Sequence, residues 1–133
     1  MVYQASPVSG QSDCVNATIA VSAEGATVGN RRDITIQLLD AAGNDLDYVE
    51  EVEIVMFLTA DRLAYVATGG STGIAIGTDG ALLTVIAKKR FFATCEADGD
   101  LDLYWTDTGT EVAFIGLKLP NGKWVMSSSL ANT

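Results

Sequence analysis

The stretch that decides the fold class is RDITIQLLDAAGN, residues 32–44. Its first eight residues alternate, so Ile34, Ile36 and Leu38 share one face of an extended chain and the polar residues between them share the other. Asp40-Ala41-Ala42-Gly43-Asn44 then supplies the residue types that form tight turns. We therefore predict a β-strand with one buried face, followed directly by a turn.

The same pattern recurs along the chain, with Gly, Asp and Asn turns roughly every 8–15 residues. Further strands are predicted at 18–22, 51–58, 74–76, 82–87, 91–95, 101–105, 112–119 and 123–128, and 62–66 is either a short edge strand or a single helical turn. Pro120-Asn121-Gly122 between two such runs predicts a hairpin. We expect an all-β fold: an antiparallel, immunoglobulin-like Greek-key sandwich over residues 17–133, preceded by an N-terminal arm at residues 1–16.

Composition narrows the class of function. The chain has 133 residues and 48% hydrophobic residues, which suits one domain with a real core. Its net charge of −9 disfavours nucleic acid and anionic lipid as partners, and no apolar run is long enough to span a membrane. With no histidine, Ser-His and Cys-His catalytic pairs cannot form within one chain. The sequence predicts a binding or structural protein that is not an enzyme and uses no cofactor.

The two cysteines, Cys14 and Cys95, lie far apart in the sequence and neither belongs to a CxxC motif. This spacing gives no support to a metal site. A disulfide between them is compatible with the sequence. Because the first residues lack the basic and apolar regions of a secretory signal, we expect two reduced thiols instead.

The densest acidic run is EADGDLD, residues 96–102. Its alternating carboxylates are a calcium-binding pattern, but an EF-hand loop counted from Asp98 fails, because Leu103 and Gly109 stand where Gly and Glu are needed. The preferred interpretation is a turn at Asp98-Gly99 and a strand whose acidic residues point outward, so no metal ligand is predicted. Gly69–Gly73 lacks the Lys-Ser/Thr ending of a phosphate loop and is expected to be mobile.

Two basic clusters and several aromatic residues are the candidates for partner binding. A basic spot on an acidic protein can dock an acidic partner, although solvated strand ends or loops are the preferred explanation of such clusters. Phe91 and Phe92 must face opposite sides of a strand, and Tyr104 lies opposite Leu103 and Trp105. Trp105 and Phe114 are expected in the core. The predicted partner-binding set is Arg31, Arg32, Lys88, Lys89, Arg90, Phe92 and Tyr104.

Two turns carry a family resemblance. Asp40-x-x-Gly43-Asn44 follows an early strand, and Ala97-Asp98-Gly99 precedes a late alternating strand. In this the chain resembles bacterial immunoglobulin-like domains and, more narrowly, is similar to small virion proteins of tailed phages that carry such a domain. The resemblance implies a capsid decoration (cement) protein, made in the host cytoplasm, that binds the major capsid protein on the outside of the virion and reinforces the shell.

Such proteins often form homo-oligomers, with trimers favoured, and the arm at residues 1–16 would contact the shell or a neighbouring subunit. The alternative is a tail, fibre or collar accessory module that binds host glycans by stacking exposed aromatic residues such as Tyr104 or Trp124 on sugars. A calcium-stabilised adhesin module is a third, weaker interpretation.

Overall fold

The computed structural model describes residues 13–133, and within this range the chain forms ten β-strands and no helix. The first sheet has the order β1–β2–β7–β4, formed by β1 (Asn16–Val21), β2 (Arg31–Leu39), β7 (Asp100–Thr106) and β4 (Gly73–Ile76). The second has the order β10–β8–β3–β6–β5, formed by β10 (Leu130–Ala131), β8 (Val112–Lys118), β3 (Glu51–Phe57), β6 (Arg90–Thr94) and β5 (Ala81–Ile86). The short strand β9 (Trp124–Met126) also pairs with β8.

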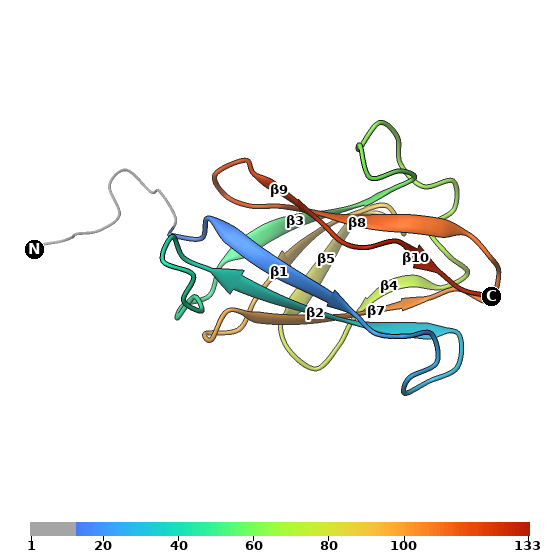
Figure 1. The fold of residues 1–133 in the computed structure, drawn as a ribbon, viewed down its shortest axis with the longest axis horizontal. Helices are drawn as coiled ribbons and strands as arrows, with labels where there is room; N and C mark the ends of the chain where they lie inside the picture. Colours follow the sequence, from blue (N-terminus) through green and yellow to red (C-terminus); the bar gives the residue numbers. More distant parts are fainter. Residues whose placement is uncertain (1–12) are drawn as a thin grey trace, which may run out of the picture.

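Every strand pair is antiparallel, and the two sheets stack as layers, with β8 and β9 above β2 and β7 in Figure 1. This confirms the predicted all-β antiparallel sandwich, while its immunoglobulin-like arrangement stays a prediction. None of the described residues forms a helix long and apolar enough to cross a membrane.

The core lies between the sheets and follows from the alternation of the strands. Ile36 stands opposite Leu101 across β2 and β7, and Ile54 stands opposite Leu117 across β3 and β8; all four are fully buried. Trp105 is also fully buried, as the sequence predicts, and its Nε1–H donates a hydrogen bond to the Gly69 carbonyl oxygen (3.1 Å). Side chains of this size account for most of the stabilisation that burial supplies.

The Asn-Gly hairpin forms where the sequence places it. Gly122 has φ +86°, a left-handed conformation that glycine adopts without a steric penalty. The Leu119 N–H donates to the Lys123 carbonyl oxygen (2.9 Å), and the Asn121 side chain accepts from the Lys123 N–H (3.0 Å). The turn thereby sets the register that brings Trp124 opposite Lys118.

One expected element, residues 62–66, and one expected core residue, Phe114, differ in the structure. Residues 62–66 form neither a strand nor a helical turn, and their one ladder contact is an isolated bridge between Phe57 and Tyr65. Phe114 is half-buried rather than in the core, because it lies on the outward side of β8. The two-residue strand β10, which pairs with the start of β8, has too short a sequence to show any alternation.

The boundary of the predicted arm also shifts. Cys14 is fully buried in the core and β1 begins at Asn16, so residues 14–16 belong to the sandwich. The rest of the predicted arm, residues 1–12, lies outside the described residues. Cys14 and Cys95 are both buried thiols that no disulfide joins, and burial raises the pKa of the Cys14 thiol to about 11.

Candidate binding surface

The outer face of the second sheet collects aromatic and basic side chains from four segments. We call it the aromatic–cationic face, and it consists of Arg62, Tyr65, Arg90, Phe92, Lys118 and Trp124. Strand alternation explains the placement, because β3 and β6 turn Val52, Ile54, Met56 and Phe91 inward and leave the residues between them on this face. Glu53 of β3 lies at its centre, opposite Phe92 on one side and Lys118 on the other.

Two apolar residues on this face are themselves covered. Val55 and Phe57 point outward from β3, yet they are only 5% and 8% exposed. The segment 58–66 folds over them and is held by hydrogen bonds from the Leu58 N–H to the Ala64 carbonyl oxygen (2.9 Å) and from the Val66 N–H to the Met56 carbonyl oxygen (3.1 Å). This covering segment brings Tyr65, which is 43% exposed, onto the face.

Trp124 is fixed by its contact with Phe57. The two rings meet edge to face, with centroids 5.4 Å apart and an interplanar angle of 71°. Gly116 makes room for them, since a Cβ there would collide with the Phe57 ring. Trp124 therefore presents a rigid, half-buried ring rather than a mobile one.

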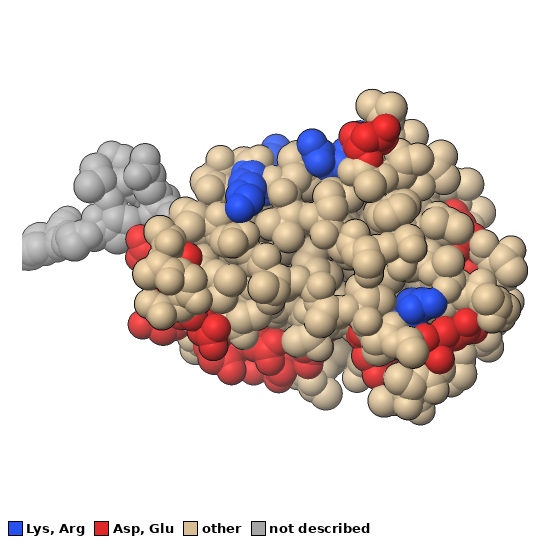
Figure 2. All heavy atoms as spheres, viewed as in Figure 1, with Lys and Arg blue, Asp and Glu red and all other residues tan. Residues whose placement is uncertain are grey.

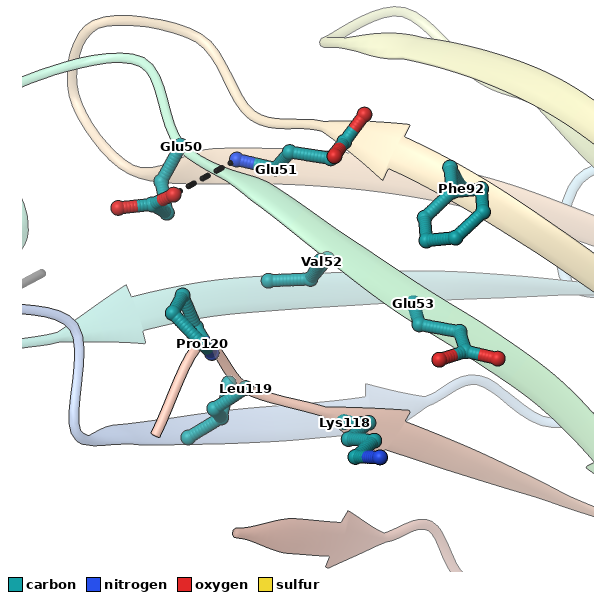
Figure 3. A pocket seen from close by; sticks show the side chains of 8 residues that line it. All are labelled: Glu50, Glu51, Val52, Glu53, Phe92, Lys118, Leu119 and Pro120. Carbon is teal, nitrogen blue, oxygen red and sulfur yellow. Dashed lines mark hydrogen bonds between the residues drawn. The ribbon is translucent and has the colours of Figure 1, made fainter. Parts of the chain in front are cut away.

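The face is hollowed into two connected grooves. One has a volume of about 320 Å³ and runs between Phe92, Lys118 and Pro120 past the carboxylates of Glu51 and Glu53. Figure 3 shows Glu53 on β3, with Lys118 on the neighbouring strand β8 and Phe92 on the opposite side, on β6.

The second groove measures about 400 Å³ and is lined by Arg62, Tyr65, Arg90 and Trp124. Both grooves share Glu53 and Lys118 in their linings, so they adjoin at these two residues. Aromatic walls with charged groups between them are typical of surfaces that bind another molecule.

Positive charge is held close to the aromatic rings. The guanidinium of Arg90 forms an ion pair with Glu53 and lies 5.6 Å from the Phe92 ring centroid. The hydrogen bond and the charge of Glu53 raise the pKa of Arg90 further above its ordinary value. Arg62 and Lys118 lie 5.6 Å and 5.8 Å from the Trp124 ring centroid, within the range of cation–π attraction.

The two signs of charge are separated over the molecule. In Figure 2 several basic residues lie along the upper edge, over β8 and β9, with one acidic group beside them, and a further basic residue lies next to acidic ones at the lower right. Acidic residues crowd the lower edge, near the ends of β2 and β7. The aromatic–cationic face thus gathers three of the basic residues of a protein whose net charge is −9, although Glu50, Glu51 and Glu53 line the same grooves.

The structure divides the predicted partner-binding residues between two opposite faces. Arg90 and Phe92 lie together on the aromatic–cationic face. Arg31 and Tyr104 lie on the outer face of the first sheet, where the Arg31 guanidinium carbon is 3.7 Å from the Tyr104 ring centroid. Arg31 also pairs with Asp33 at 3.0 Å, so its charge is partly neutralised.

The remaining three predicted residues make contacts inside the protein. Arg32 donates to the carbonyl oxygens of Ser22 (2.9 Å) and Ala131, which fixes the segment around β10 against the first sheet. Lys88 Nζ donates to the Ser71 carbonyl oxygen (2.9 Å). The Lys89 carbonyl oxygen accepts from the Met56 N–H, and its side chain is half-exposed.

A buried carboxylate site at Gly69–Gly70 has no signal in the sequence. The Glu111 carboxylate accepts hydrogen bonds from the backbone N–H groups of Thr68 (3.0 Å), Gly69 (3.0 Å) and Gly70 (2.8 Å). Burial raises the pKa of Glu111, but these bonds and one from the Thr68 hydroxyl outweigh it and lower the pKa to about 2. The glycine-rich loop therefore binds an anion, as phosphate loops do, but the anion is a side chain of the same protein.

Three carboxylates meet at the lower edge. Asp79, Asp100 and Asp102 each place an oxygen within 4.8 Å of the others. Asp100 Oδ1 is buried and has no hydrogen-bond partner among the described residues, and burial together with Asp79 and Asp102 raises the pKa of Asp100 to about 6. Three side chains give fewer oxygens than the six to eight that calcium takes. The Asp98 carboxylate is instead used in its own turn, where it accepts from the Asp100 N–H (3.1 Å).

Comparison with known protein families, curated sequences and solved structures finds no match to this chain. Its own geometry and chemistry therefore carry the functional conclusion.

Proposed function

We propose that this protein is a non-enzymatic structural component of a phage particle, a decoration protein that binds the outer surface of the capsid through its aromatic–cationic face and stabilises the shell. The observation that carries the proposal is the pair of adjoining grooves lined by Phe92, Tyr65 and Trp124 together with Arg62, Arg90 and Lys118. The phage particle enters the proposal through the resemblance of the two turn motifs to phage immunoglobulin-like domains.

The chemistry of the face indicates the kind of surface it fits. Tryptophan, tyrosine and arginine side chains are enriched among the residues that dominate the binding energy of protein interfaces, where they fill well-packed positions from which water is excluded. Three basic groups placed around the rings favour a shell surface that is apolar and acidic. Since many copies would bind one shell, contacts that are individually weak combine into strong overall reinforcement.

The copy number of the protein in purified particles is the first test. Quantitative mass spectrometry against the major shell protein is expected to find hundreds of copies in a fixed ratio to the shell subunit. A few to a few tens of copies would instead place the protein in the tail, fibre or collar. Complete absence from particles would overturn the proposal.

The docking face is tested with shells that lack the protein. We expect Phe92→Ala and Tyr65→Ala to weaken shell binding at least tenfold, because each removes an aromatic contact of about 1.4 kcal/mol or more. Tyr104→Ala, on the outer face of the first sheet, is the matched control and should bind as the unmodified protein does. The reverse pattern would move the docking site to the face of Arg31 and Tyr104.

The predicted contact of the arm with the shell is tested by deleting residues 2–12. A longer deletion would remove Cys14 from the core and disturb the fold. Loss of shell binding with an unchanged melting temperature would support the arm contact. Unchanged binding would refute it.

Glycan binding is the second candidate function, and the groove beside Trp124 favours it. Tyr65 and Trp124 line the same 400 Å³ groove, together with Arg62 and Arg90. Aromatic rings can stack on sugar rings, and arginine can bind acidic sugars. A glycan array, with Trp124→Ala as the comparison, tests this function, and silence on the array would remove it.

A further inference from the structure

We propose that two copies of this protein associate through β5, which pairs antiparallel with β5 of a second copy and joins the two second sheets into one. β5 is the edge of its sheet: it pairs with β6 on one side, and no described strand pairs with its other side. The inference is independent of the proposed attachment to a capsid.

β5 lacks the charges and the proline that commonly protect a sheet edge. Edge strands usually carry charged residues or proline, because an unpaired row of N–H and C=O groups can recruit another chain. β5 has the sequence ALLTVI, with no charge and no proline. Leu83, Val85 and Ile86 are 65%, 45% and 40% exposed. A register shift between Thr84 and Ile86 affects only the last part of the strand and leaves the first four residues regular.

The charges at the two ends of β5 indicate that the partner is a second copy. Before the strand, Asp79 lies close enough to Glu96 for its charge to raise the pKa of that side chain, and it also lies beside Asp100 and Asp102. After the strand, the turn into β6 carries Lys88 and Lys89, and Lys88 adopts φ +65°. Each end therefore carries a cluster of one sign, and the two clusters are opposite.

Antiparallel pairing matches these ends. A two-fold axis near the middle of β5 places the start of one strand beside the end of the other, so the acidic end of each copy faces the Lys88–Lys89 turn of its partner. Parallel pairing would place like charges together. The same surface on both copies is thus self-complementary in hydrogen bonding, in apolar contact and in charge, although the chain as a whole carries −9.

Sedimentation equilibrium of the purified protein at low salt is the direct test. An interface of one short strand is smaller than the 1,200–2,000 Å² of stable complexes, so we expect a dimer with a Kd on the order of 100 µM. Raising the salt concentration should weaken it, because exposed charges are screened. A monomer throughout the concentration series would overturn the proposal, and a trimer would show that a different surface is used.

The apolar contact is tested with Leu83→Lys, which places like charges near the two-fold axis. Dimers should disappear while the melting temperature holds, because Leu83 is already largely exposed. Leu63→Lys makes the same chemical change at a residue that is 82% exposed on the segment 58–66, and it should leave the dimer intact. Equal dimerisation of both variants would reject β5 as the interface.

A charge exchange tests the antiparallel arrangement. Lys89→Glu alone and Glu96→Lys alone should each raise the dimer Kd roughly fivefold, about 1 kcal/mol. The double variant restores an opposite pair in each contact and should regain most of the affinity. Asp47→Lys, a charge reversal in another turn, controls for the change in net charge. Additive weakening in the double variant would refute the antiparallel arrangement.

Discussion

Replacing Glu111 by glutamine should destabilise the protein and change its response to acid. The carboxylate is the acceptor for backbone N–H groups of Thr68, Gly69 and Gly70, and this loop in turn accepts the hydrogen bond from Trp105. Glutamine keeps one oxygen but turns an NH₂ group toward N–H donors. Partly buried donors then lose their acceptor, which is more costly than losing an exposed hydrogen bond.

The magnitude follows from the pKa. A carboxyl with a pKa of about 2 in the folded protein and 4.5 when unperturbed corresponds to a stabilisation of roughly 3 kcal/mol at most. Since the Glu111 side chain is partly exposed to solvent, which screens the interaction, we expect a loss of about 2 kcal/mol for Glu111→Gln at pH 7. A domain of this size should then melt roughly 6–8 °C lower.

The pH dependence provides the sharper measurement. Because the folded-state pKa of Glu111 is lowered, its contribution is complete above pH 4.5 and is lost as the pH falls toward 2. Urea unfolding of the unmodified protein and of Glu111→Gln should therefore give free energies that converge as the pH is lowered from 7 to 2.5. Glu51→Gln, at an exposed position, is the control and should change neither value by more than about 0.5 kcal/mol. A difference for Glu111→Gln that is equally large at both pH values would refute the reasoning.

Three further predictions concern other polar and buried groups. Asp100→Asn should raise the free energy of unfolding, measured with urea at pH 7.5, by about 1 kcal/mol after allowance for solvent screening. Because the pKa of Asp100 is raised from 3.8 to about 6 in the folded protein, this gain should vanish below pH 4. Arg32→Met should cost about 2 kcal/mol, and hydrogen exchange at residues 130–133 should accelerate; unchanged exchange there would contradict the role of Arg32 as an anchor. Cys14 and Cys95 should react with a thiol reagent only at the rate of unfolding, so rapid modification of the native protein would show that they are not buried as described.

Most of the sandwich could be predicted from the sequence, because a strand with one buried face has alternating apolar and polar residues. β2 and β7 show this directly, and the hairpin at residues 120–122 shows it through turn chemistry. The second half of β3 is apolar on both sides, which predicts a central strand or one covered by a partner. β3 is central, between β8 and β6, and the cover over Val55 and Phe57 comes from the protein's own segment 58–66.

Contacts between segments that are distant in the sequence have no such local pattern and could not be predicted. Trp124 reaches the aromatic–cationic face through the pairing of β9 with β8, and Tyr65 reaches it through a single bridge to Phe57. Glu111 and its N–H donors are 41–43 residues apart in the chain. Arg90 and Phe92 could be predicted as binding residues from their residue types and from the local alternation of their strand. Their spatial neighbours could not be predicted, because these depend on tertiary packing.

Residues 130–133 form a strap that is expected to dock late in folding. Arg32 bonds to Asn132, which lies 100 positions further along the chain, and the Asn132 amide donates to the carbonyl oxygens of Asn30 and Asp107. Loops of this length close slowly, so we expect the strap to form after the rate-limiting step, when both sheets are already in place. Weakening it should then accelerate unfolding while leaving the refolding rate nearly unchanged. The strap thus governs the unfolding rate, and with it the lifetime of the folded molecule, rather than the folding rate.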